Sequence, residues 1–391
     1  MKVVFWTALG IALYTYIGYA ALLWFLVKCK RLFKPSAPIS TPDTWPNVTF
    51  IIAAWNEEDF IQKKLDNSQQ FDYPANKLRI LVVTDGSTDR TPELVSAHPP
   101  GPFEVILAHQ PKRQGKIAAV NRVMPMVQSP IVIYSDANTW VNPQAIKNIV
   151  RHYRDPQVGA VAGEKRIALP EKGDAPGAGE SIYWKYESTL KRLDAEWHSV
   201  VGAAGELFSI RTCLYEAVPS DTIVEDFFLT TRIAMRGYRV AYEPQAYAIE
   251  NQSVSIEEEL KRKIRIAAGG LQAAWRLRSL VNPFRYGSLS FQYISHRLLR
   301  WTLAPMSLPI LFITNGWLAP THWLYGTLFG TQIAFYSMAL AGKLLARRPM
   351  RFKAFFIPYY FCVMNYAVYR GFFRLISGRQ SVLWERAQRI Q

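Results

Sequence analysis

The chain has 391 residues, more than an average domain requires, and half of them are apolar although the formal net charge is +16. Its lysines and arginines gather beside the apolar segments, as in the basic rim of a membrane protein. The pattern does not suggest a single-strand nucleic-acid binder, in which aromatic and basic residues interleave. Cys29, Cys213 and Cys362 have neither metal-like spacing nor a disulfide pattern, so a reducing compartment is the simplest expectation.

The first apolar segment, residues 3–27, contains no charge and exceeds the roughly 20 residues that cross a bilayer. A basic cluster follows it in place of a small-residue cleavage site, so we expect a membrane anchor and not a signal peptide. The positive-inside rule places this cluster in the cytoplasm and the N-terminus outside. Residues 1–34 are therefore predicted as a transmembrane helix with its basic flank, followed by a short linker over 35–46.

Strand and helix patterns alternate between residues 48 and 162, which predicts a mostly parallel, doubly wound α/β sheet. Neither G-x-G-x-x-G nor a Walker A loop occurs, which disfavours dinucleotide and P-loop nucleotide binding. A Gly/Pro-rich loop is expected over residues 164–180 and a helix over 181–197. The predicted strands are residues 48–54, 78–84, 103–107, 131–135 and 158–162, and the predicted helices are 57–70, 92–97, 116–127 and 143–154.

Residues 251–300 are predicted to form amphipathic helices at the membrane interface. Ser255-x-x-Glu258 indicates a capping box, and apolar residues then recur at helical spacing, with Arg262 and Arg265 on the opposite face. Residues 301–391 hold three more apolar stretches, at 301–318, 324–345 and 354–373. With the N-terminal segment they predict about four transmembrane helices, although polar residues in the last stretch leave its crossing open.

A strand that suits burial, residues 131–135, runs directly into Asp136 and Asn138. In open α/β sheets, ligands bind beyond the carboxyl ends of the strands. A D-x-D-like pair at such a place can present oxygens to a hard divalent cation, which in turn holds a diphosphate. The alternative is that both residues simply begin a turn, which their side chains favour.

A second polar motif, Thr84-Asp85-Gly86-Ser87-Thr88-Asp89, follows the second predicted strand. Turn formation alone explains such a sequence, but Asp85 could also accept hydrogen bonds from a nucleotide base or ribose. Asn56, Glu57 and Glu58 end the first strand and would lie beside it. Gly115 and Lys116 open the next helix, where a cation and free N–H groups suit a phosphate.

A further acidic pair, Glu225 and Asp226, begins a helix that is predicted to end near Gly237. Acidic residues in a first helical turn stabilise the helix dipole, which is the structural explanation. The functional alternative is that Asp226 faces a cavity and acts as general base towards an acceptor hydroxyl. Gly202 and Gly205, just upstream, would let the backbone approach a bound sugar.

The motifs TDGSTD, SDAN, VED and RKIRI occur in the order seen in glycosyltransferase family 2. The chain most resembles the membrane-integrated branch that includes cellulose, hyaluronan and poly-N-acetylglucosamine synthases and ceramide glucosyltransferase. The resemblance covers about residues 48–278. It implies a GT-A type domain over residues 46–250, a nucleotide-diphosphate sugar donor such as a UDP-sugar, Mg²⁺ or Mn²⁺, and inversion by single displacement.

The resemblance also implies roles for individual residues. Asp226 would be the base, and Arg265 would neutralise the leaving diphosphate, because placed cations stabilise the charge that develops in the transition state. The full implied site comprises Asp226, Glu225 and Arg265 as catalytic residues, Asn56, Glu57, Glu58, Asp85, Lys116, Asp136 and Arg262 around the nucleotide sugar, Gly202 and Gly205 on the acceptor side, and Asp136 and Asn138 at the metal.

Two departures from the family pattern shape the functional hypothesis. Asn138 replaces the second acid of D-x-D, and Arg262 and Ile266 replace the Gln and Trp of Q-x-x-R-W. Because that Trp accompanies processive synthesis in the family, we expect transfer of one sugar to a lipid-linked or glycan acceptor, at the cytoplasmic face of the plasma (inner) membrane. The alternatives are a processive polysaccharide synthase coupled to secretion, with an oligomer or partner for the channel, and a catalytically silent scaffold that binds nucleotide sugar.

Overall fold

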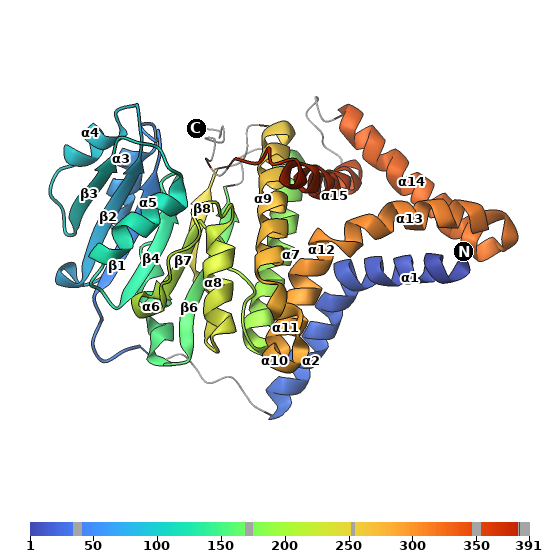
Figure 1. The fold of residues 1–391 in the computed structure, drawn as a ribbon, viewed down its shortest axis with the longest axis horizontal. Helices are drawn as coiled ribbons and strands as arrows, with labels where there is room; N and C mark the ends of the chain where they lie inside the picture. Colours follow the sequence, from blue (N-terminus) through green and yellow to red (C-terminus); the bar gives the residue numbers. More distant parts are fainter. Residues whose placement is uncertain (34–40, 169–174, 252–254, 346–352, 382, 384–391) are drawn as a thin grey trace.

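The structure, a computed structural model, describes residues 1–33, 41–168, 175–251, 255–345, 353–381 and 383. Most of the predicted linker and part of the predicted 164–180 loop lie outside these residues. The described chain contains an eight-stranded sheet in the order β3-β2-β1-β4-β7-β6-β8-β5 (Figure 1). The strands are β1 Val48–Ala54, β2 Leu78–Asp85, β3 Glu104–Gln110, β4 Ile131–Asp136, β5 Thr139–Val141, β6 Val158–Ile167, β7 Leu207–Arg211 and β8 Arg239–Glu250.

The predicted α/β fold is confirmed, and the sheet is mixed. β1 lies between β2 and β4, with both pairings parallel, and all seven of its residues are buried, as in a strand covered on both faces. β7 was not predicted. It enters antiparallel between β4 and β6, so parallel and antiparallel pairings occur in one sheet.

Helices cover both faces of the sheet and form two apolar cores (Figure 1). Ile117 of α5 and Phe227 of α8 belong to one core, and Ile61 of α3 and Ile146 of α6 belong to the other. Each such fully buried side chain contributes about 1.5–3 kcal/mol. The helices of this part are α3 Ile61–Ser68, α4 Thr91–Ser96, α5 Lys116–Val123, α6 Ala145–Val150, α7 Ala175–Trp197 and α8 Glu225–Met235.

The predicted loop over 164–180 is wrong at both ends. β6 continues to Ile167 because β8 runs parallel to it and pairs Glu164 with Tyr247 and Ile167 with Glu250. At the other end, α7 already begins at Ala175. The strand is extended by hydrogen bonds to a partner about 80 residues away along the chain, which local Gly/Pro content does not reveal.

Two helices in the described chain are long and apolar enough to cross a membrane. One runs from Lys2 to Phe33, through α1 (Lys2–Leu13), a π-helical turn and α2 (Tyr19–Phe33), and the other is α14 (Trp323–Leu345). A third would need Ser288–Trp301 and Leu303–Thr321 to act as one span, although they are bent by 54° at Thr302. The described residues thus contain two or three candidate spans, where the sequence predicts about four. The shorter helices of this region are α10 Pro283–Tyr286, α11 Ser288–Tyr293, α12 Leu299–Trp301 and α13 Leu303–Leu318.

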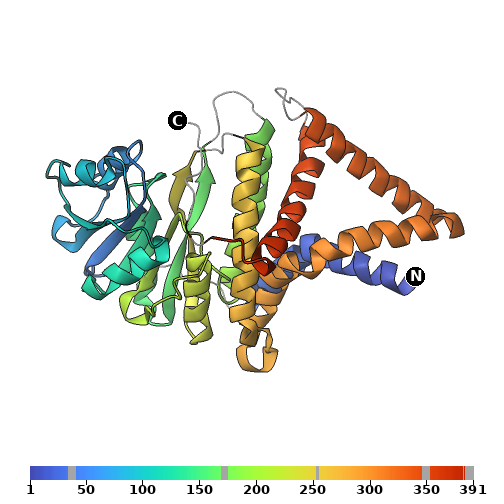
Figure 2. The same cartoon turned by 45° about the horizontal axis from the view of Figure 1, so that its top comes forward.

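The last apolar stretch forms α15 (Lys353–Ile376), which falls outside the candidate spans of the described chain. It packs against α9 (Ile256–Arg276), which stands between the sheet and the helices that include the candidate spans (Figure 2). The contact is close: a Cβ added at Gly371 would lie 2.8 Å from the amide nitrogen of Ala268. The predicted N-cap of α9 is confirmed, since Ser255 Oγ accepts a hydrogen bond from the N–H of Glu258 at 3.2 Å. The part of the α9 stripe around Ile264, Ala267 and Ala268 is thus buried against α15, whereas Trp275 at its end is 72% exposed.

Candidate active site

Charged residues from the ends of several elements meet in one cavity of about 910 Å³. Lys116, at the start of α5, places Nζ 2.7 Å from Asp136 Oδ1 at the end of β4 and 2.8 Å from Glu225 Oε1 at the start of α8. A Cβ added at Gly205 would lie 3.4 Å from Asp226 Oδ2 and 3.6 Å from Lys116 Nζ. Five of the predicted site residues are therefore neighbours, and all five line the cavity.

The remaining predicted residues do not all lie in one place. Asn138, Glu57, Arg262 and Arg265 line the same cavity. Gly202 is packed instead against the ring of Phe227, where an added Cβ would lie 2.0 Å from a ring carbon. Its φ of +81° also favours glycine.

Asp85 is 1% exposed and supports the loop that carries Lys116. Its carboxylate oxygens accept hydrogen bonds from the backbone N–H groups of Gln114, at 2.9 Å, and Gly115, at 2.6 Å. Gly115 has a φ of +100° and precedes the first helical residue, so this turn needs glycine. Asp85 therefore sets the start of α5 and, through it, the position of the Lys116 ammonium.

The polar residues that end β1 tie this strand to the loop after β2. Asn56, with a φ of +52°, accepts a hydrogen bond on Oδ1 from the N–H of Thr88 at 2.8 Å. The N–H of Glu57 donates to Thr91 Oγ1 at 2.8 Å, and that of Glu58 donates to Asp89 Oδ2 at 3.1 Å. The turn chemistry expected of TDGSTD is therefore present.

The acidic pair of α8 titrates unequally. Burial and the neighbouring Glu225 carboxylate raise the pKa of Asp226 to about 7. Burial alone would raise the pKa of Glu225 as well, but the Lys116 ammonium outweighs it and lowers that pKa. Burial also raises the pKa of Asp136, against the opposing effect of Lys116. Near neutral pH, Glu225 is therefore a carboxylate paired with Lys116, whereas Asp226 is present in both its protonated and its ionised form.

Asp136 and Asn138 offer the oxygen ligands that a hard divalent cation prefers, and the Asp136 side chain is 32% exposed. Asn138 lies in the turn between β4 and β5 and also lines the cavity. The segment therefore forms the expected turn and still presents a side chain to the site. No group of three or more His, Cys, Asp or Glu side chains within the described ranges could hold a metal. Mg²⁺ commonly binds through one or two carboxylates together with substrate phosphates and water, and this limited donor set fits that mode.

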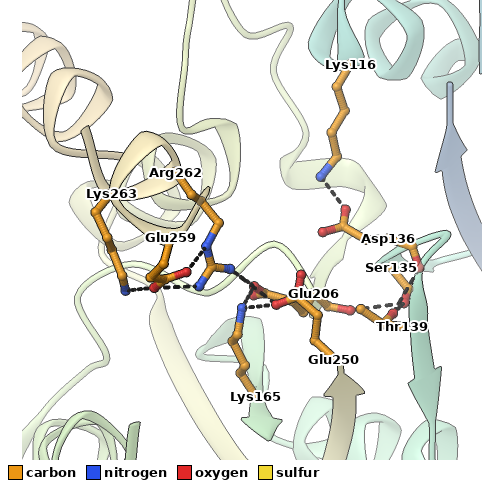
Figure 3. Close-up of polar contacts among 10 residues, drawn as sticks. All are labelled: Lys116, Ser135, Asp136, Thr139, Lys165, Glu206, Glu250, Glu259, Arg262 and Lys263. Atoms are coloured by element: carbon orange, nitrogen blue, oxygen red, sulfur yellow. Dashed lines mark hydrogen bonds and ion pairs between the residues drawn. The ribbon is translucent and has the colours of Figure 1, made fainter. Parts of the chain in front are cut away.

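The two arginines of α9 differ. Arg262 belongs to a buried ion network: its guanidinium contacts Glu259 at 3.1 Å and Glu250 at 3.2 Å, and Lys165 pairs with both Glu250 and Glu206 (Figure 3). Arg265 Nη2 lies 3.5 Å from the carbonyl of Ile223, and its buried Nε has no hydrogen-bond acceptor among the described residues. Of the two, Arg265 has donor capacity left for an anion.

Sequence reasoning missed several residues around the site. Lys165, Glu206 and Glu250 carry no motif, and only the tertiary structure brings them together (Figure 3). Lys64 lies beneath β4 and donates to Ser135 Oγ at 2.8 Å, and burial lowers its pKa to about 7. Lys64 directly follows Lys63 in the same short helix, and the sequence alone gives no sign of which of the two is buried.

Residues 49–214 match the model of Glycosyl transferase family 2. A poly-beta-1,6-N-acetyl-D-glucosamine synthase of Staphylococcus aureus is 27% identical over 243 residues, 60% of this chain and 57% of that protein. A beta-monoglucosyldiacylglycerol synthase of Synechocystis is 28% identical over 268 residues, 61% of this chain and 53% of that protein. The chain thus spans little more than half the length of these relatives.

Among solved structures, the mannosyltransferase PcManGT from Pyrobaculum calidifontis, in complex with GDP-Man and Mn²⁺, matches with a TM-score of 0.71. The match has 23% sequence identity and covers 96% of this chain and 99% of that chain. It establishes the GT-A-like fold of the sheet and its helical surroundings. Residues 49–214 therefore form a glycosyl transferase family 2 domain.

Proposed function

We propose that this protein transfers one sugar from a nucleotide-diphosphate donor, a UDP-sugar in the first instance, to an acceptor hydroxyl with inversion at the anomeric carbon. The observation that carries this proposal is Asp226, whose pKa of about 7 suits a general base and which lines the cavity beside Lys116 and Asp136. A catalytically silent scaffold would not need a carboxylate with this pKa beside the Lys116 ammonium.

In the proposed reaction, Asp226 takes the proton of the acceptor hydroxyl as its oxygen forms a bond to the anomeric carbon. The bond from that carbon to the diphosphate oxygen breaks on the opposite face, and the nucleoside diphosphate leaves with the electron pair. Lys116 and Arg265 stabilise the negative charge that develops on it. A divalent cation held by Asp136 and Asn138 would supply further Lewis-acid stabilisation to the diphosphate.

The domain is proposed to sit on the cytoplasmic side of the inner membrane and to act on a lipid-linked acceptor. The candidate spans that flank the domain support this, as does a relative named for a glucosyldiacylglycerol product. A processive synthase is the second candidate, because another relative is named for a polysaccharide. Ile266 in place of the family's Trp and only two or three candidate spans in the described chain favour single transfer.

The test is nucleoside diphosphate release from a panel of UDP- and GDP-sugars, with Mg²⁺, with Mn²⁺ and with a chelator. We expect one donor to be turned over, metal to be required, and Asp226→Asn to slow release by at least about 10²-fold. Asp221→Asn is the matched control, because this exposed carboxylate lies just before the same helix and pairs with Arg276 at 2.5 Å. Nucleotide binding without turnover of any donor would refute transfer and favour the scaffold. Long polymer from purified protein would refute single transfer.

A further inference from the structure

The cavity continues past Asp226 towards the membrane helices. There it is lined by Glu187 and Lys191 of α7, Arg297 of the π-helical turn before α12, and Arg300 of α12; we call these four residues the basic compartment. The two ends belong to one cavity, and the ring of Trp301, which follows Arg300, lies 5.2 Å from the ring of Phe227, which follows Asp226. An acceptor bound in the basic compartment would therefore extend towards the proposed base.

Positive charge exceeds negative charge in this compartment. Glu187 is the one carboxylate among these four residues. Its oxygens lie 2.7 Å from Arg297 Nη1, 2.9 Å from Arg300 Nη1 and 3.1 Å from His296 Nε2. The nearby carboxylate of Asp194 is bound by Tyr19, Gln292 and His296. Arg297 and Arg300 thus share one carboxylate, and with Lys191 the four residues of the compartment hold three basic side chains against one acidic one.

Part of that surplus has no acceptor within the described ranges of the chain. Lys191 is only 3% exposed, and its ammonium lies 5.9 Å from the centre of the Trp184 ring but makes no hydrogen bond or ion pair with a described residue. Burial lowers its pKa. Nε and Nη2 of Arg300 are likewise buried without an acceptor there. Burying cationic donors without partners is costly, so the arrangement is explained if a bound anion supplies the acceptors.

The opposite wall of the cavity is apolar and belongs to α15, with Ile357, Phe361 and Met364 among the lining residues. The aromatic rings nearby are poor platforms for a sugar, because cations already approach them. Lys165 and Lys263 lie 4.8 and 5.3 Å from the centre of the Trp184 ring. A ligand with an anionic head and an apolar tail matches these walls better than a polysaccharide does.

We propose that the basic compartment binds the phosphate of a lipid-phosphate acceptor, with Lys191 and Arg300 as its ligands and the hydrocarbon chain along α15. Phosphate suits this site because it offers several oxygens to an ammonium and a guanidinium at once. The inference rests on the proposed function, which it deepens by naming the acceptor class.

The test compares binding of farnesyl phosphate and of farnesol to the full-length wild-type protein in detergent, by change in tryptophan fluorescence. We expect farnesyl phosphate to bind at least tenfold more tightly than farnesol, since the two differ only in the phosphate. Equal affinities would overturn the proposal without any variant. The proposal would also be overturned if inorganic phosphate bound as tightly as farnesyl phosphate. It would likewise be overturned if a glucosamine oligosaccharide displaced bound farnesol but farnesyl phosphate did not.

Two variants then assign the site. Lys191→Gln and Arg300→Gln should each weaken farnesyl phosphate binding at least tenfold and leave farnesol binding unchanged. Lys185→Gln, on the exposed side of α7, is the matched control and should bind like the wild type. Unchanged farnesyl phosphate affinity in both variants would refute the assignment. Farnesyl phosphate binding that depends on Lys191, in a protein that turns over no donor, would refute the proposed function and retain the phosphate site.

Discussion

The pH dependence of turnover tests the proposed role of Asp226 most directly. With a pKa of about 7, this carboxyl is about one-tenth ionised at pH 6 and about nine-tenths ionised at pH 8. A rate that depends on the ionised base should therefore rise about tenfold between these pH values, with its midpoint near 7. Asp226→Asn should lower kcat by about 10²–10⁴-fold, the usual contribution of a general base, and should remove this pH dependence.

The same residue should reduce stability. Its folded pKa of about 7 lies above the ordinary value of 3.8, so between these values the folded protein keeps a proton that the unfolded chain has lost. Stability from this group falls as pH rises through that window, and the full penalty applies above pH 7. The difference corresponds to roughly 4 kcal/mol. Because Asp226 is only partly buried by surface area, solvent screening reduces the penalty to about 2 kcal/mol.

Asp226→Asn should therefore be inactive yet more stable, with Tm a few degrees higher at pH 8 than that of the wild type and nearly equal at pH 4. Continuous nucleoside diphosphate release between pH 5 and 9 and thermal unfolding in the same buffers measure both effects. Asp221→Asn should change neither. A flat wild-type profile between pH 6 and 8, or a lower Tm for Asp226→Asn at pH 8, would contradict the reasoning.

Three further substitutions test the framework of the site. Gly202→Ala should destabilise the protein by about 2–5 kcal/mol, since it adds strain at positive φ to a clash with Phe227. Gly237→Ala is the matched control, because Gly237 has a φ of +91° and no described atom within 4 Å of the added Cβ. It should lower stability by about 1 kcal/mol, and equal losses in Tm for the two variants would refute the clash at Gly202. Lys165→Met should lower the free energy of unfolding by about 3–5 kcal/mol, because it removes the ammonium that pairs with the buried carboxylates of Glu206 and Glu250. A clearly smaller loss in denaturant unfolding would show that the ion network is dispensable. Asp85→Asn should raise the KM for the donor about tenfold, because it loosens the turn before Lys116, and an unchanged KM would count against that support.

Local patterns predicted the elements whose signals are local. β1 and β4 are runs of apolar residues buried on both faces, and the start of α9 is marked by the hydroxyl of Ser255, which caps it. The helix that carries Glu225 and Asp226 was predicted for the same reason, with Gly237 just beyond its last turn. In each case the deciding interactions lie within a few residues of one another along the chain.

Other elements depend on partners far away in the sequence. β7 and the end of β6 form because β4 and β8 supply hydrogen bonds, and neither segment shows a strand pattern strong enough alone. α15 is long enough for a span but not apolar enough to count as a candidate, and Gly371 and the small residues of α9 let these two helices pack closely. Composition records how apolar a helix is, whereas the tertiary structure decides what covers it.

By itself the sequence determined the α/β class, the order of the family motifs and the residues that end β1, β2 and β4, because periodicity and turn chemistry are properties of short segments. Only the tertiary structure decided which charges meet. It brought Lys116 to Asp136 and Glu225, raised the pKa of Asp226, and buried Lys191 without a hydrogen-bond acceptor among the described residues. The physical reason is that the energy of a charge depends on its burial and on its neighbours in space, which local sequence does not specify.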